Sequence, residues 1–383
     1  MNGFPRGKAA ICGAATFGIG DASGFTSMDM AVNASLKALR QANLTPADVD
    51  ALFICLPGDF ISGLSFAEYL GIQPKITENN RTGGSAFLTH LAWAALALDA
   101  GLCDTALIAY GSNQRSAAGR LVSAAAPDPY EGVYKPRLPV GAYALAAARH
   151  MYEFGTTPEQ LAEVAVSARQ WANLNPDAFM QGDLTVNDVL SARRVAEPLG
   201  VRDCCLVTDG GAAVVVTRAD RARDLAAKPA HVLGSAAATF HMNIAMMPDL
   251  TVTAASESGP AAYAQAGVSH ADIDVCELYD AFSINPILFM EDLGFCPKGE
   301  GGRYFEEGRT APGGEMPVNT NGGGLSCVHP GMYSLFALVE AVEQIAGTAG
   351  ARQVDDVDVA LVHGNGGFLS SQVTAILGSA ATL

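Results

Sequence analysis

The sequence contains no apolar run of the roughly 18 residues that a membrane-spanning helix requires, although hydrophobic residues make up 49% of its 383 residues. Charged residues are scarce at 16%, and acidic residues outnumber basic ones, which gives a formal net charge of −16. Nucleic acids and anionic membranes bind to basic surfaces, so neither is expected as a partner. Residues 1–20 have a glycine-interrupted apolar stretch of strand character in place of a signal-peptide core, and we therefore expect a cytoplasmic protein.

The eight cysteines show none of the paired C-x-x-C spacings of zinc sites, and their pattern indicates no disulfide framework. We therefore expect no metal site within this chain. Most of the cysteines lie in apolar runs, which favours buried thiols. The length is sufficient to bury a large core and allows two or three domain-sized units.

Short apolar strands alternate with helical stretches along most of the chain. The first predicted strand, 8–15, is followed by an amphipathic helix over 28–44 and then by a buried strand within 45–58. A second helical run at 86–100 precedes a strand within 103–112. This alternation predicts an α/β fold with a mainly parallel sheet.

Two segments of the second half of the chain repeat segments of the first. SHADIDVCELYD at 269–280 is similar to TPADVDALFICL at 45–56, and DVALVHG at 358–364 is similar to TALIAYG at 105–111. The two offsets differ, so the second copy carries insertions. Internal similarity of this kind predicts a duplicated α/β unit.

The two predicted units span residues 1–225 and 226–383, and the first includes a loop domain at about 113–200. Its first part is rich in proline, glycine and alanine and is expected to be irregular as far as residue 137. Predicted helices follow at 140–154 and 157–174. The second of them opens with Thr-Pro-Glu-Gln, which is typical of a capping box.

An anionic substrate such as a nucleotide-bearing thioester needs local basic residues in so acidic a chain. The irregular part of the loop domain holds four candidates: Arg115, Arg120, Lys135 and Arg137. For any single one of them, an ordinary solvated surface position is the simpler interpretation.

A glycine-rich stretch at 318–334, VNTNGGGLSCVHPGMYS, is the most distinctive local sequence. Its three consecutive glycines allow positive φ angles and close approach of another backbone or a ligand. His329 follows them, just ahead of an apolar helical run. The pattern places an imidazole at the mouth of a helix, although alone it is also compatible with a structural turn.

Taken together, the duplicated units, the glycine-rich loop that ends in His-Pro and a glycine cluster after the last repeat resemble the thiolase superfamily. The segment LYDAFSINPILFMEDLGFCPKGEGGRYFEEG at 278–308 is similar to the SCP2-type thiolases in particular. The resemblance covers nearly the whole chain. It implies a five-layered α-β-α-β-α arrangement, a tight homodimer and acyl-CoA substrates, with coenzyme A as part of the substrate and no covalently bound cofactor.

The first catalytic motif of that family departs from its usual form here. It normally holds a nucleophilic cysteine at the start of a helix, and the corresponding run at 78–86 is ENNRTGGSA, with Arg81 at the cysteine position. No cysteine lies between Cys55 and Cys103. Ser85 lies beyond the nucleophile position and has no adjacent base, so helix capping or packing is its expected role.

The other motifs imply three candidate catalytic residues. YDAF places Tyr279 at the usual Asn or His position, VHP retains His329, and HGNGG places His363 at the position of a second catalytic cysteine. The resemblance implies that Tyr279 acts as general base, that His329 donates to an enolate oxygen, and that His363 or Tyr333 donates a proton. Tyr279 as a satisfied buried hydroxyl and His363 as a turn cap remain the structural alternatives.

The resemblance therefore implies an enzyme of lipid metabolism that makes or breaks a carbon–carbon bond in an acyl-CoA, by retro-aldol cleavage of a 3-hydroxyacyl-CoA. Related proteins of this kind work with a small partner that has an OB-fold and a zinc ribbon (DUF35-type). Two alternatives stay open. The chain is an acyltransferase of the 3-ketoacyl-CoA thiolase or acetyl-CoA acetyltransferase type, or it is a non-catalytic subunit of a thiolase-like complex.

Overall fold

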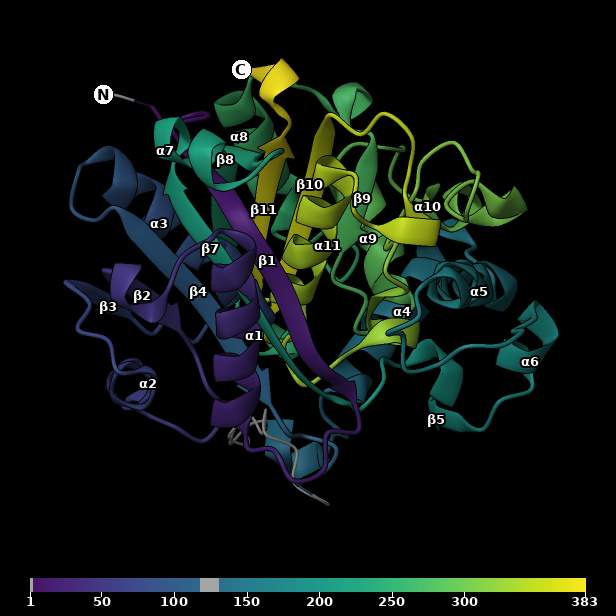
Figure 1. The fold of residues 1–383 in the computed structure, drawn as a ribbon. Helices are drawn as coiled ribbons and strands as arrows, with labels where there is room; N and C mark the ends of the chain where they lie inside the picture. Colours follow the sequence, from purple (N-terminus) through teal and green to yellow (C-terminus); the bar gives the residue numbers. More distant parts are fainter. Residues whose placement is uncertain (1–2, 118–130) are drawn as a thin grey trace.

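The computed structural model describes residues 3–117 and 131–383, which form a mixed α/β structure around one large sheet (Figure 1). The sheet has nine strands in the order β3-β2-β4-β7-β1-β8-β11-β10-β9. Their bounds are β1 Ala9–Gly20, β2 Ala51–Ile54, β3 Ile76–Glu78, β4 Thr105–Ser112, β7 Asp209–Arg218, β8 Ala230–Thr239, β9 Val275–Leu278, β10 Val359–Gly366 and β11 Ser371–Gly378. A short hairpin of β5 (Arg194–Ala196) and β6 (Leu199–Gly200) lies apart from it.

The sheet consists of two halves with the same topology. In the first half the strands run β3-β2-β4-β7-β1, and in the second they run β9-β10-β11-β8, with a parallel bridge between Cys276 and Val318 where a third strand would pair. β2 is parallel to β3 and β4, and β9 is parallel to β10. The pairs β4–β7, β7–β1, β1–β8, β8–β11 and β11–β10 are antiparallel, so the prediction of a mainly parallel sheet is wrong. The halves meet where Ala10 and Ile11 of β1 pair with His231 and Ala230 of β8.

Helices cover both faces of the sheet, and two central helices lie between its two halves. α1 (Ser27–Gln41) packs on β1, β4 and β7, and α8 (Ala255–Ala266) packs on β8 and β11. α3 (Ala86–Asp99) and α11 (Ser334–Ala346) contact each other and strands of both halves. This arrangement of outer helices, sheet, central helices, sheet and outer helices confirms the predicted duplicated five-layered fold.

The remaining helices surround this framework: α2 Ser62–Leu70, α4 Val140–Phe154, α5 Pro158–Leu174, α6 Val186–Leu190, α7 Ala219–Leu225, α9 Ile284–Asp292 and α10 Gly301–Tyr304. The predicted capping box at the start of α5 is confirmed, because the Gln160 backbone N–H donates to the Thr157 hydroxyl at 3.3 Å and Thr157 N–H donates to the Gln160 side chain at 3.0 Å. The domain boundary at residue 225 stays a prediction.

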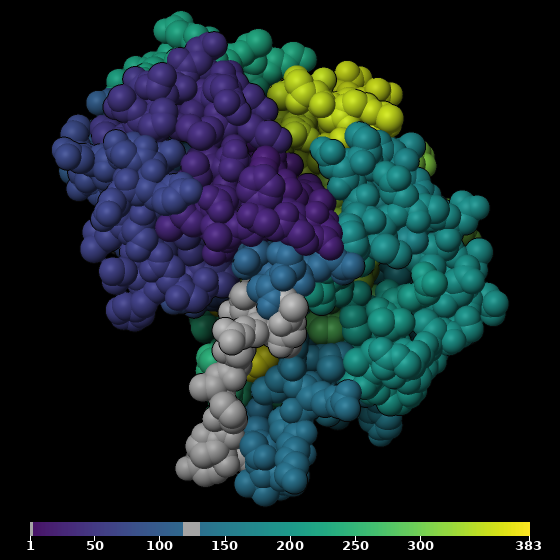
Figure 2. All heavy atoms as spheres, turned by 60° about the horizontal axis from the view of Figure 1, so that its bottom comes forward, coloured from purple at the N-terminus to yellow at the C-terminus, as the bar shows by residue number. Residues whose placement is uncertain are grey.

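Segments distant in sequence meet on the face turned forward in Figure 2. The purple N-terminal residues and the teal region that contains α5 lie at the front of this face. Yellow and green atoms from the second half of the chain lie deeper, between them. Within 3–117 and 131–383, no helix is both long and apolar enough to cross a membrane. In the same ranges, no cluster of three or more His, Cys, Asp or Glu side chains is placed to hold a metal ion.

Candidate functional site

The glycine-rich loop is fixed to the end of β9 by a buried carboxylate. Gly324 N–H and Leu325 N–H donate to the two oxygens of Asp280 at 2.5 and 3.1 Å. Gly323 has a φ of 64°, and a Cβ added there would overlap the Asp280 carboxylate, so this position requires glycine. Burial raises the pKa of Asp280 to about 7 against the opposing effect of these two N–H donors. The motif residue after Tyr279 thus positions the loop that contains His329.

Tyr279 and His329 form a hydrogen-bonded pair at this loop. The His329 Nε2 lies 3.1 Å from the Tyr279 hydroxyl, with the rings edge to face at 5.5 Å between centroids. Burial lowers the pKa of His329 to about 4 and raises that of Tyr279 well above its usual range, so both groups are neutral at pH 7. One proton is shared along this contact. The other ring nitrogen, His329 Nδ1, is buried without a hydrogen-bond partner in the described part of the chain.

Tyr333 lies against the same pair. Its ring is nearly parallel to that of His329 at 6.4 Å and perpendicular to that of Tyr279 at 5.7 Å. Its hydroxyl donates to the Asn321 Oδ1 at 2.9 Å, within the glycine-rich segment. Three of the sequence-predicted residues are therefore brought together by β9, the loop and the start of α11.

His363 occupies a different position. It lies on β10, where Nδ1 is 2.9 Å from the Thr374 hydroxyl and Nε2 is 2.9 Å from Gln372 Oε1. Its ring packs on Phe289 of α9, and burial lowers its pKa to about 4. Only its backbone carbonyl contacts the pair, by accepting from Tyr279 N–H at 3.0 Å. Both imidazole nitrogens are occupied, so a proton-donor role for His363 stays a prediction.

A chain of side-chain hydrogen bonds leads from His363 to another tyrosine. Gln372 Nε2 donates to Asn365 Oδ1 at 2.8 Å, and Asn365 Nδ2 donates to the hydroxyl of Tyr143 on α4 at 2.9 Å. Tyr143 lies close enough to Tyr279 to contribute to its raised pKa. Sequence reasoning missed Tyr143, because nothing in an alanine-rich helix of the loop domain marks it.

The loop that lacks the nucleophile packs against Tyr279 through Gly84. Arg81 is exposed, and three residues later a Cβ added to Gly84 would overlap the ring of Tyr279. The Ser85 hydroxyl lies 3.0 Å from that of Ser371 and 3.1 Å from that of Thr82. Ser85 therefore takes part in local packing of this loop, the role expected for it.

One thiol does lie near the pair, and sequence spacing did not reveal it. Cys205 is half-buried, its N–H donates to the Ala281 carbonyl at 2.8 Å, and it contributes to the raised pKa of Tyr279. Burial raises the pKa of the Cys205 thiol itself well above its usual range. A nucleophilic cysteine needs the opposite shift, so this environment disfavours a thiolate.

The four basic residues proposed for coenzyme binding do not form one cluster among the described residues. Arg115 Nε lies 3.6 Å from Asp21 Oδ2, and the Arg115 guanidinium carbon lies 4.7 Å from the centroid of the Phe179 ring. Lys135 and Arg137 are exposed on the segment before α4. Arg120 lies outside the described residues. Their role in binding stays a prediction.

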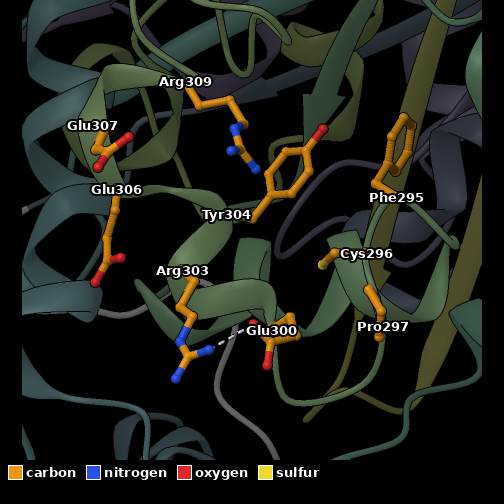
Figure 3. A pocket seen from close by; sticks show the side chains of 9 residues that line it. All are labelled: Phe295, Cys296, Pro297, Glu300, Arg303, Tyr304, Glu306, Glu307 and Arg309. Atoms are coloured by element: carbon orange, nitrogen blue, oxygen red, sulfur yellow. Dashed lines mark hydrogen bonds and ion pairs between the residues drawn. The ribbon is translucent and has the colours of Figure 1, made fainter.

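A surface pocket of about 600 Å³ lies elsewhere, on the segment that includes α10 (Figure 3). Arg303 pairs with Glu300 at 3.3 Å, and Arg309 lies over the Tyr304 ring at 5.1 Å. None of the predicted catalytic residues lines it. Because Tyr279, His329 and Tyr333 contact one another, we place the candidate active site at these three residues and not at this pocket.

The chain is similar to several known proteins. Residues 236–379 match the family model described as "Thiolase C-terminal domain-like". An acetyl-CoA acetyltransferase of Methanothermobacter thermautotrophicus is 34% identical over 94% of this chain and 96% of its own. A steroid side-chain-cleaving aldolase of Thermomonospora curvata is 32% identical over the same shares, 94% and 96%. The solved structure of an Ltp2-ChsH2(DUF35) aldolase has a TM-score of 0.88 at 31% identity and covers 98% of each chain.

Proposed function

Because this chain belongs to the thiolase superfamily, as its resemblance to the SCP2-type members predicted, we propose that it cleaves a carbon–carbon bond of an acyl-CoA by retro-aldol chemistry. The substrate is a 3-hydroxyacyl-CoA. The observation that supports this proposal most directly is the buried Tyr279–His329 pair, 3.1 Å apart, beside a loop that has lost its nucleophile.

The pair accounts for removal of the 3-hydroxyl proton and for stabilisation of the enolate. Tyr279 takes the proton of the 3-hydroxyl group while its own proton passes to His329 Nε2. The C2–C3 bond then breaks, the C3 oxygen becomes a carbonyl oxygen, and the electron pair enters the thioester enolate. The imidazolium of His329 donates to the enolate oxygen, where an oriented donor in a dry site is most effective. Tyr279 has given one proton and taken another, so it is already neutral. The cycle is completed when C2 is protonated and the extra proton of His329 passes to the group that protonated C2.

Tyr333 and His363 are the two candidate donors of the proton that reaches C2. Tyr333 is favoured by its place against His329, with its hydroxyl on Asn321 at 2.9 Å. His363 is instead connected through Gln372 and Asn365 to Tyr143. We propose that His363 orients this chain of groups.

Product analysis tests the proposal. The purified chain is incubated with 3-hydroxyacyl-CoA and 3-ketoacyl-CoA thioesters, with and without free CoA. Release of an aldehyde or ketone from the 3-hydroxy substrate without CoA is the expected result. Cleavage of the 3-keto substrate alone, and only with CoA, would overturn it.

Acyl transfer is the second candidate, because a relative named acetyl-CoA acetyltransferase is 34% identical to this chain. It requires a covalent acyl-enzyme, and Cys205 is the half-buried thiol near Tyr279. Radiolabelled acyl-CoA followed by denaturation distinguishes the candidates, since label that is retained by the protein but absent from Cys205→Ala identifies acyl transfer. A non-catalytic subunit is the third, and unchanged pathway flux after substitution of Tyr279 and His329 would favour it.

We propose a small DUF35-type partner with an OB-fold and a zinc ribbon. The support is the solved Ltp2-ChsH2(DUF35) aldolase, which this chain matches over 98% of its length. Zinc belongs to that partner, since we expect no metal ligands in this chain. Co-purification of a zinc-containing protein of this kind with the tagged chain is the expected result.

We also propose a homodimer. β3 is an edge strand, and α2, which packs on it, presents large apolar side chains to solvent together with the two residues that precede it. Phe60, Ile61 and Leu64 are 84%, 53% and 61% exposed. An edge strand beside such a patch favours association with a second copy. Light scattering of Leu64→Glu against the unaltered chain tests this, with a monomer as the expected result.

Coenzyme A enters as part of the substrate, and we propose that Arg115, Arg120, Lys135 and Arg137 bind its phosphates. Weaker binding of CoA by alanine variants, with the largest loss at low salt, is the expected result.

A further inference from the structure

The first turn of α9 holds a buried side-chain amide, that of Asn285, without a hydrogen-bond partner among the described residues. Asn285 is fully buried, and its backbone N–H donates to the Phe282 carbonyl at 2.9 Å. Neither the Oδ1 nor the Nδ2 of its side chain has a hydrogen-bond partner in the described part of the chain. Buried polar groups are nearly always paired, and each unpaired one costs about 1–3 kcal/mol. An amide unpaired at both ends therefore indicates that a ligand or water completes it.

The amide lies beside the candidate active site. It is close enough to Tyr143 to oppose the raised pKa of that phenol, although no hydrogen bond of ordinary geometry joins them. Tyr143 stacks on Phe282 at 4.3 Å and itself contributes to the raised pKa of Tyr279. Asn285, six residues after Tyr279 in the chain, therefore lies next to Tyr143, whose ring packs on Phe282 of the same segment.

Neighbouring buried amides differ from Asn285 in that they are bonded. Asn365 contacts both Tyr143 and Gln372, and Asn175 Nδ2 donates to the Asn321 carbonyl at 2.9 Å. Ordinary packing in this region therefore satisfies its amides. Asn285 differs from these two amides, and His329 Nδ1 is a second group at this site without a hydrogen-bond partner among the described residues.

The chemistry of the site restricts what this amide binds. An amide offers both a donor and an acceptor, which matches a hydroxyl group that accepts one hydrogen bond and donates another. Its aromatic neighbour Phe282 and the neutral phenol of Tyr143 provide no charge to hold a carboxylate or a phosphate. The fitting ligand is a neutral oxygen function on an otherwise apolar molecule.

We propose that Asn285 is a specificity-determining residue that binds the 3-hydroxyl group of the acyl chain and selects it over an acyl chain without oxygen at that carbon. This inference rests on the proposed function only in taking an acyl-CoA as substrate. Asn285 Nδ2 donates to the hydroxyl oxygen and Oδ1 accepts its proton, until Tyr279 takes that proton in the reaction.

The test measures binding without turnover. Calorimetry compares a 3-hydroxyacyl-CoA with the saturated acyl-CoA of the same chain length, on the chain together with its partner protein, using Tyr279→Phe to prevent cleavage. We expect about tenfold tighter binding of the 3-hydroxy thioester, the equivalent of one good neutral hydrogen-bond pair. In the same background, Asn285→Leu is expected to abolish the preference and Asn285→Ala to do so without added bulk.

Stability separates this role from a structural one. Asn285→Leu removes an unpaired buried amide, so its melting temperature is expected to equal or exceed that of the unaltered chain. Asn175→Leu, which removes a bonded buried amide, is expected to lower it by several degrees. A preference that persists in both Asn285 variants overturns the proposal, as does equal binding of the two thioesters before substitution. Binding without cleavage in the chain with Tyr279 intact would overturn the proposed reaction and leave this inference standing.

Discussion

Removal of one oxygen atom from Tyr279 gives the sharpest test of its assigned role. Tyr279→Phe keeps the ring that covers Gly84 and packs against His329 and Tyr333. It removes the 3.1 Å contact with His329 Nε2 and a long 3.4 Å contact with the Gly331 carbonyl. The folded structure therefore loses little more than one buried hydrogen bond, about 0.5–1.5 kcal/mol of unfolding free energy.

The effect on catalysis is expected to be much larger than the effect on stability. A positioned general base contributes about 10²–10⁴-fold to a rate. We expect kcat for retro-aldol cleavage to fall by that factor while the affinity for the thioester changes little. The assay follows release of the carbonyl product under saturating substrate, together with unfolding in urea.

A matched control removes a hydroxyl outside the site. Tyr263 donates to the Leu293 carbonyl at 3.1 Å, so Tyr263→Phe loses a comparable bond with no contact to the Tyr279–His329 pair. We expect its kcat to remain within a factor of two. A Tyr279→Phe enzyme that retains more than a third of the original kcat would refute the assignment of the base.

Three further substitutions test the structural account. Gly84→Ala places a Cβ against the Tyr279 ring and 2.7 Å from the Asn365 carbonyl oxygen, so we expect a loss of about 1–3 kcal/mol in urea unfolding together with loss of activity; an active and stable variant would contradict the described packing. Asp280 has a pKa of about 7 in the folded protein and an ordinary value of 3.8. Between these two values the native state holds a proton that the unfolded state has released. The free energy of unfolding is therefore expected to fall as the pH rises from about 4 to about 7, by up to about 4 kcal/mol. Asp280→Asn is expected to flatten this part of the stability profile and to lower activity by loosening the His329 loop, and an unchanged pH slope would count against it. Thr157→Ala removes the N-cap of α5 and is expected to cost about 1 kcal/mol with activity retained, whereas a neutral effect would contradict the capping box.

Local sequence predicted most of the fold because strong local patterns agree with the tertiary structure. Helices α4 and α5 begin and end within a residue of their predicted bounds, since capping and apolar periodicity act over a few residues. The repeated segments predicted the equivalence of β2 with β9 and of β4 with β10. The third strand of the second half was reduced to a bridge at Val318, and no periodicity in a polar loop reveals that.

The site was predictable only where motifs lie on the segments that meet. Tyr279 and His329 are 50 residues apart and come together because Asp280 binds the glycine-rich loop. The side of β10 on which His363 lies depends on strand alternation within the sheet, which a motif alone does not specify. Tyr143 and Cys205 reach the site through long-range packing of α4 and a loop, so no spacing connects them with Tyr279 in the sequence. Asn285 lies only six residues after Tyr279, but no sequence pattern shows that its side-chain amide lacks a partner.

The central claim is that this chain forms a thioester enolate without an acyl-enzyme. The most direct measurement follows one 3-hydroxyacyl-CoA in deuterated water, without free CoA and with the co-purified partner present. The account predicts equal amounts of free carbonyl compound and shortened acyl-CoA, with one deuterium at C2 of the thioester. Cleavage that requires added CoA, or that leaves acyl label on Cys205, would contradict it.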